Sequence, residues 1–139
     1  MTSLHLDRNR RYVLGLGCER GTPPAEVLEL AETALRTAGA QASRLAGVAS
    51  IDSRRDEPAI LAVAAHFGVP AVFFDAGTLE RETPRIKNPS DIVFARVGCH
   101  GVAEPASLAA IGLEADLVVP KIKSAHATAA VACIRLRKE

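Results

Sequence analysis

The fold is decided by residues 12–24, which read YVLGLGCERGTPP. An apolar run breaks into glycines, and two prolines then open an amphipathic stretch, so these residues predict a buried strand, a loop and a helix start. The unpaired amides and the positive dipole end of such a helix start favour an anion. Gly15, Gly17 and Gly21 leave room for a ligand against the backbone, and the amides of residues 15–21 are expected to form an anion-binding nest.

This glycine loop differs from the dinucleotide-binding fingerprint, because its spacing is G-x-G-x-x-x-G, one residue longer. The acidic residue that would bind a ribose is also displaced, since Asp52 lies roughly 30 residues after the loop instead of about 20. A nucleotide-binding domain is therefore a disfavoured alternative.

Outward from this loop, apolar runs alternate with amphipathic stretches. Strands are expected at residues 11–17, 46–51, 71–74, 116–119 and 128–136, and helices at residues 23–38, 58–67, 78–82, 90–97 and 103–111. The alternation predicts one three-layer α/β domain over residues 11–139, with a mostly parallel sheet and helices on both faces. Residues 1–10 are expected to be a flexible N-terminus. The last strand is expected to be antiparallel to its neighbour, because the loop before it (residues 120–127) is short enough for a hairpin.

The composition excludes several classes of function. The net charge is +1 and aromatic residues make up 4%, which argues against nucleic acid and anionic membranes as partners. No apolar run approaches the roughly 20 residues of a membrane span, and the polar start is not a secretory signal. The three cysteines are far apart and form no C-x-x-C pair, so we expect reduced thiols in a cytoplasmic protein, with neither a metal site nor a cofactor.

Four polar segments are expected at one edge of the sheet, where loops follow the carboxyl ends of strands. They are residues 15–21, 51–58, 85–90 and 120–128, and each contains a cation beside a small residue or a helix start. If they converge, they form a basic, polar cleft suited to a polycarboxylate or a phosphate.

Each candidate also has a plainer interpretation. Arg54 lies among acidic neighbours, as in a solvated helix start. Lys121 and Lys123 point the same way along an extended segment, either as a pair of cations for a ligand or as an exposed sheet edge. Asp52 is either a catalytic carboxylate or a helix cap. Of the four histidines, His126 is the best placed to meet a ligand, because it lies in a polar loop.

The ordered segments resemble the family formed by the CobE proteins of cobalamin biosynthesis and the C-terminal domain of CbiG, the cobalt-precorrin-5A hydrolase. The resemblance runs from about residue 11 to about residue 136, and the matching segments are residues 15–21, 51–58, 88–90, 97–98, 102–104 and 118–124. It implies an α/β domain that binds a precorrin-type modified tetrapyrrole, a ring carrying acetate and propionate arms.

On this interpretation the chain is a carrier or an accessory factor, with other enzymes of corrin synthesis as possible partners. The ligand-binding candidates are Gly15, Gly17, Cys18, Arg20, Gly21, Arg54, Asn88, Lys121, Lys123 and Ser124. The alternative is a hydrolase acting on the lactone of a precorrin-5A-like intermediate, since CbiG opens such a lactone and releases acetaldehyde. Asp52 or Glu57 would then be the base and His126 the proton shuttle.

Overall fold

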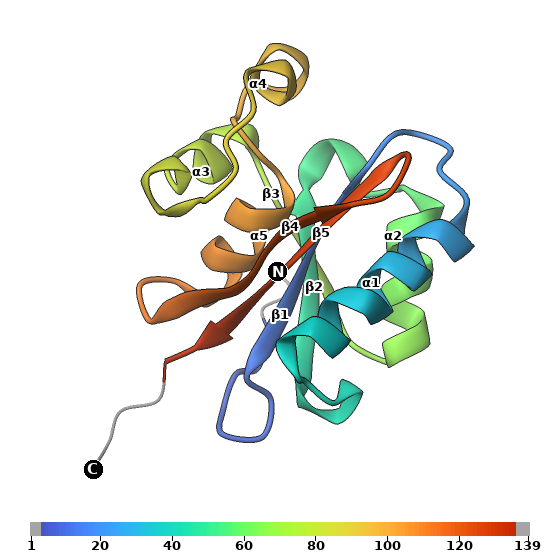
Figure 1. Cartoon of the computed structure of the whole chain (residues 1–139), viewed down its shortest axis with the longest axis vertical. Helices are drawn as coiled ribbons and strands as arrows, with labels where there is room; N and C mark the ends of the chain where they lie inside the picture. The colour runs from blue at the N-terminus through green and yellow to red at the C-terminus, as the bar shows by residue number, and fades with distance from the viewer. Residues whose placement is uncertain (1–3, 136–139) are drawn as a thin grey trace.

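A five-stranded sheet lies between two layers of helices in the computed structural model, which describes residues 4–135 (Figure 1). The strands are β1 (Tyr12–Cys18), β2 (Leu45–Ile51), β3 (Ala71–Phe74), β4 (Ala115–Lys123) and β5 (Ala127–Ile134). The helices are α1 (Pro24–Ala38), α2 (Pro58–Phe67), α3 (Ala76–Glu80), α4 (Asp91–Val97) and α5 (Ala103–Ile111), with short 3-10 turns η1 (Ala42–Arg44), η2 (Asp52–Arg54) and η3 (Thr83–Arg85).

The strand order is β3-β2-β1-β5-β4. β1, β2 and β3 pair in parallel, whereas β5 is antiparallel to both β1 and β4. The α/β class and the antiparallel last strand are therefore confirmed. The expectation of a mostly parallel sheet holds only for β1–β3, because the β4–β5 hairpin places β5 directly beside the central strand.

Alternate residues of β1 face the two helical layers. Leu14 and Leu16 pack in the core beneath α1 and α2, and Val13 packs in a second core on the α5 side. Gly15 also faces α5, so closely that a Cβ there would lie 1.9 Å from the carbonyl oxygen of Ala103. The absence of a side chain at this position is therefore needed for helix-on-sheet packing.

Most predicted boundaries lie within two residues of the observed ones, and the chain departs further at two places. β4 continues through Pro120 to Lys123, so four residues expected in a loop belong to a strand. The proline is tolerated because β4 is an edge strand whose register is irregular between Val119 and Ile122. Near the N-terminus, Leu4 and Leu6 pack against the α5-side core. Residues 1–3 and 136–139 of the predicted segments lie outside the described residues.

Candidate functional site

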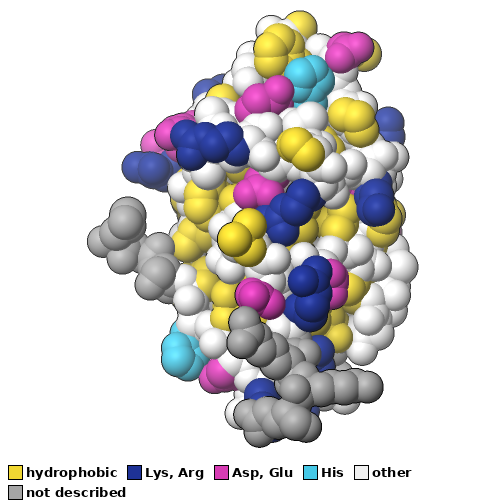
Figure 2. Space-filling model, turned by 90° about the vertical axis from the view of Figure 1, so that its left-hand side faces the viewer, with side chains coloured by type: hydrophobic (Ala, Val, Ile, Leu, Met, Phe, Trp, Pro, Cys, Tyr) yellow, Lys and Arg dark blue, Asp and Glu magenta, His cyan; other side chains and the backbone are white. Residues whose placement is uncertain are grey.

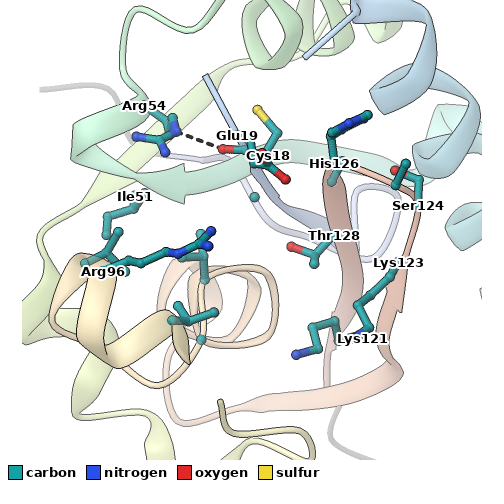
Figure 3. A pocket seen from close by; sticks show the side chains of 17 residues that line it. Cys18, Glu19, Ile51, Arg54, Arg96, Lys121, Lys123, Ser124, His126 and Thr128 are labelled. Carbon is teal, nitrogen blue, oxygen red and sulfur yellow. Dashed lines mark hydrogen bonds between the residues drawn. The ribbon is translucent and has the colours of Figure 1, made fainter. Parts of the chain in front are cut away.

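One pocket, of about 260 Å³, lies at the edge of the sheet where β1, β2 and β4 end and β5 begins (Figure 3). The strand order changes direction at β1 and β5, and such a switch point leaves a crevice beyond the strand ends. α4 and the turn before α5 complete the walls. The lining residues are Gly17, Cys18, Glu19, Ile51, Arg54, Val93, Arg96, Val97, Gly101, Val102, Lys121, Lys123, Ser124, Ala125, His126, Ala127 and Thr128.

The pocket is basic although the chain is nearly neutral. Arg54 and Arg96 lie on one side of it and Lys121 and Lys123 on the other (Figure 3). Glu19 is the one carboxylate among the lining residues. The predicted convergence of Arg54 with the two lysines is thus present in the structure. Arg96 was missed because nothing in its local sequence indicates that α4 packs beside the pocket.

The floor of the pocket is apolar and depends on a glycine. Ile51 and Val102 line it, and a Cβ at Gly17 would lie 2.8 Å from the Thr128 hydroxyl oxygen and 3.3 Å from the Val102 Cβ. Gly17 therefore keeps the bottom of the pocket open. A polar rim over an apolar floor is the usual build of a small-molecule site.

The four cations differ in how firmly the protein holds them. Arg54 donates from Nε to the carbonyl oxygen of Cys18 at 2.8 Å, and the Lys121 ammonium donates to the carbonyl oxygen of Asn88 at 3.3 Å. The side chains of Arg96 and Lys123 make no hydrogen bond or ion pair with the part of the chain the structure describes. These two cations are available to an anionic ligand.

Glu26, in the first turn of α1, holds the loop between β4 and β5 at the pocket mouth. Its carboxylate accepts hydrogen bonds from the Ser124 hydroxyl and from the His126 amide at 2.7 Å, and its other oxygen lies 3.0 Å from His126 Nδ1. The Ser124 and His126 hydrogen bonds lower the pKa of Glu26 to about 2, and the hydrogen bond and charge of Glu26 raise the pKa of His126. Both shifts favour the ionised form of the pair.

Glu104 joins the segment before α4 to β4. It is only 2% exposed, and its carboxylate accepts hydrogen bonds from the amides of Lys87, Asn88 and Lys121 and from the Asn88 side chain, at 2.8 to 3.0 Å. Burial alone would raise the pKa of Glu104, but the hydrogen bonds from Lys121 and Asn88 outweigh it and lower that pKa. Asn88 therefore supports the pocket wall and does not line the pocket.

The anion-binding nest expected at residues 15–21 is wrong. β1 is the central strand, and its residues 15–18 are paired with β5, residue 15 also with β2. Beyond the strand, the Glu19 amide donates to the carbonyl oxygen of His126 at 3.0 Å, and the Gly21 amide donates to the buried Glu57 carboxylate at 3.1 Å. The protein's own groups therefore occupy these donors.

Several predicted residues lie outside the pocket lining. Arg20 donates to the carbonyl oxygen of Ser53 at 3.2 Å, and Asp52 is exposed in η2. Glu57 is buried beside the Gly21 amide, so the structure gives it a role in fixing the glycine loop. Cys18 does line the pocket, but burial and the nearby Glu57 charge raise the pKa of its thiol, which keeps it protonated at neutral pH.

Two other kinds of feature are absent from residues 4–135, the range that the structure describes. Within this range no group of three or more His, Cys, Asp or Glu side chains is arranged to hold a metal ion. No helix of the same range is both long and apolar enough to cross a membrane.

Comparison with known proteins places this architecture among proteins of cobalamin synthesis. The family model for the cobalamin synthesis G C-terminus (CbiG_C) matches residues 12–132. Protein CobE of Sinorhizobium sp is 63% identical over 120 residues, which cover 86% of this chain and 78% of that protein. The crystal structure of CobE, a protein from the cobalamin (vitamin B12) biosynthetic pathway, superposes with a TM-score of 0.84 at 32% identity, covering 91% of this chain and 92% of that one.

A longer relative contains the same region. Cobalt-precorrin-5A hydrolase of Priestia megaterium is 33% identical over 129 residues. The match covers 93% of this chain but 34% of the hydrolase, so the chain spans about a third of that enzyme.

Proposed function

Because the chain belongs to the cobalamin synthesis G C-terminus family and is a protein of cobalamin biosynthesis, we propose that its pocket binds the carboxylate arms of a precorrin-type tetrapyrrole. In this role the protein is a carrier or an accessory factor that holds an intermediate of the pathway. Other enzymes of corrin synthesis are its proposed partners.

The observation that carries the proposal is the set of four cations around an apolar floor. Arg54, Arg96, Lys121 and Lys123 come from η2, α4 and β4, and they share the pocket with the single carboxylate of Glu19. Cations from separate elements suit a ligand with several carboxylates, and each can form a charge-assisted hydrogen bond. The valines and Ile51 would contact the hydrocarbon part of the same ligand.

The size of the pocket limits how a macrocycle can bind. Its volume of about 260 Å³ is below the ~300–1,000 Å³ of pockets that enclose drug-sized ligands. A tetrapyrrole would therefore lie across the mouth, with one edge of the ring and its acid arms inserted. Gly17, Cys18 and Ser124 would contact the inserted part, and the cations would contact the arms.

Charge reversal at β4 tests this proposal. Titration of the protein with uroporphyrin, a tetrapyrrole with only carboxylate arms, should change the porphyrin absorbance, and the affinity should fall as salt rises. The double variant Lys121→Glu/Lys123→Glu should bind far more weakly than the native chain. The matched control is Arg55→Glu/Arg81→Glu, which has the same net charge but changes two exposed residues outside the pocket lining. Equal losses in the two variants would refute the basic pocket as the binding site.

A second candidate function is hydrolysis of the lactone in a precorrin-5A-like intermediate. The Glu26–His126 pair favours it, because a carboxylate that orients an imidazole at a pocket mouth is a common proton-transfer arrangement. The name of the longer relative points to the same reaction. Release of acetaldehyde from cobalt-precorrin-5A, abolished by His126→Gln, would support this function, and no turnover above buffer would refute it.

A further inference from the structure

α4 is a weakly held wall of the pocket. None of its seven residues is buried, and the side chains of Ile92 and Phe94 are 69% and 45% exposed. In Figure 2 hydrophobic side chains are visible at the top of the molecule, over α4. Most helical stability in proteins comes from packing of an apolar face, so a short helix without a buried residue can move at low cost.

The segment is joined to the body through a small set of contacts. α4 begins after Ser90 and is followed by Gly98, which has a φ of 85°. The Ser90 amide donates to the carbonyl oxygen of His100 at 2.7 Å, and the Phe94 ring stacks on the His100 ring with 4.4 Å between centroids. His100 is itself held by Glu80, 2.8 Å from its Nδ1. Val97, the last residue of α4, packs against the edge of the α5-side core, so α4 would pivot about this residue and His100.

Arg96 is the cation that α4 brings to the pocket. It lies on the helix face that also presents Val93 and Val97 to the cavity, and its guanidinium has no partner within residues 4–135. Arg54, the last residue of η2, already donates to the carbonyl oxygen of Cys18. A guanidinium forms two parallel hydrogen bonds to one carboxylate, so an unpaired arginine on a weakly held helix is suited to close on an acid arm.

We propose that Arg96 is a specificity-determining residue for the ligand carboxylate, and that α4 is a hinged wall which closes on the ligand through this arginine. The inference rests on the proposed carboxylate-binding function of the pocket. A ligand shifts a conformational equilibrium only by its different affinity for the two states, and the Arg96–carboxylate contact supplies that difference. Ligands whose carboxylate arms reach α4 would therefore bind more tightly than ligands whose arms reach only β4.

Hydrogen–deuterium exchange with uroporphyrin as the probe tests the inference. In the native chain, uroporphyrin should slow amide exchange at residues 91–98. Arg96→Gln should still bind the porphyrin through the β4 lysines, roughly tenfold more weakly, but should show no slowing at these residues. Arg81→Gln, an exposed arginine outside the pocket lining, is the matched control and should behave as the native chain does.

The outcomes separate this inference from the function on which it rests. If the porphyrin binds but amide exchange at residues 91–98 does not change, the hinged wall is overturned and the carboxylate pocket stands. The same conclusion holds if exchange slows equally in the native chain and in Arg96→Gln. Absence of binding by the native chain would overturn the proposed function and the hinged wall together.

Discussion

Replacing Glu104 by Gln should destabilise the protein strongly although the shape of the side chain barely changes. The carboxylate accepts the Lys87 and Asn88 amides on one oxygen, and the Lys121 amide and the Asn88 side chain on the other. A glutamine keeps one oxygen and turns an NH2 group toward two donors. Hydrogen bonds to a charged group are worth about 1.5–3 kcal/mol each and an unsatisfied buried donor costs ~1–3 kcal/mol, so relaxation of the loop leaves a net loss of about 3 kcal/mol.

Urea unfolding followed by circular dichroism measures this loss. At this chain length ~3 kcal/mol corresponds to a fall of roughly 10 °C in melting temperature. Glu32→Gln, an exposed position on α1, is the matched control and should change stability by less than ~0.5 kcal/mol. A similarly small change in Glu104→Gln would refute the assignment of Glu104 as the residue that holds the segment before α4 against β4.

The same carboxylate gives the effect a pH dependence. The pKa of Glu104 is lower in the folded protein than its ordinary value of 4.5, so its contribution is complete above that value and is lost as the pH falls through the folded pKa. The difference in unfolding free energy between the native chain and Glu104→Gln should therefore be constant near neutral pH and narrow in acid. If the difference in unfolding free energy does not narrow in acid, the stabilising role of the ionised Glu104 carboxylate is contradicted.

Three other predictions follow from the pocket and the sheet. Gly15→Ala should lower the unfolding free energy by about 2–3 kcal/mol in urea, since its Cβ would meet the Ala103 carbonyl oxygen, and a change near zero would refute the close packing of α5. Gly17→Ala should weaken uroporphyrin binding several-fold, because its Cβ narrows the pocket floor, and should change the melting temperature much less. An unchanged affinity would show that the ligand binds elsewhere. Uroporphyrin affinity should fall as the pH rises through the raised pKa of His126, because the neutral imidazole no longer attracts carboxylates. Glu26→Gln should move the midpoint of that fall toward the ordinary pKa of 6.5. If the midpoint does not move, His126 is not the group whose titration controls binding.

Much of the fold follows from residues close together in the sequence. The glycine loop after an apolar run predicted β1 and the start of α1, and glycines at residues 39 and 68 mark the ends of α1 and α2 with left-handed φ values of 68° and 66°. Such signals depend on the backbone freedom of one or two residues, so they act before any long-range contact forms. The extent of β4 was misjudged, because Pro120 ends a central strand but not an edge strand, and strand order cannot be derived from local pattern.

Part of the site could also be predicted from the sequence. Loops at the carboxyl ends of strands meet in any open α/β sheet, which is why Arg54 and the β4 lysines could be placed together. The ordered motifs also pointed to the family that the comparisons confirm.

Tertiary structure alone decided which polar groups are hydrogen-bonded within the protein and which remain free to bind a ligand. Glu26 and His126 are 100 residues apart and meet only because α1 packs beside the β4–β5 turn. The Gly21 amide was expected to bind a ligand, but the packing of α2 supplies the Glu57 carboxylate to it first. Hydrogen bonds need atoms placed to within a few tenths of an ångström, and that precision arises from the packing of whole elements, not from the pattern along the chain.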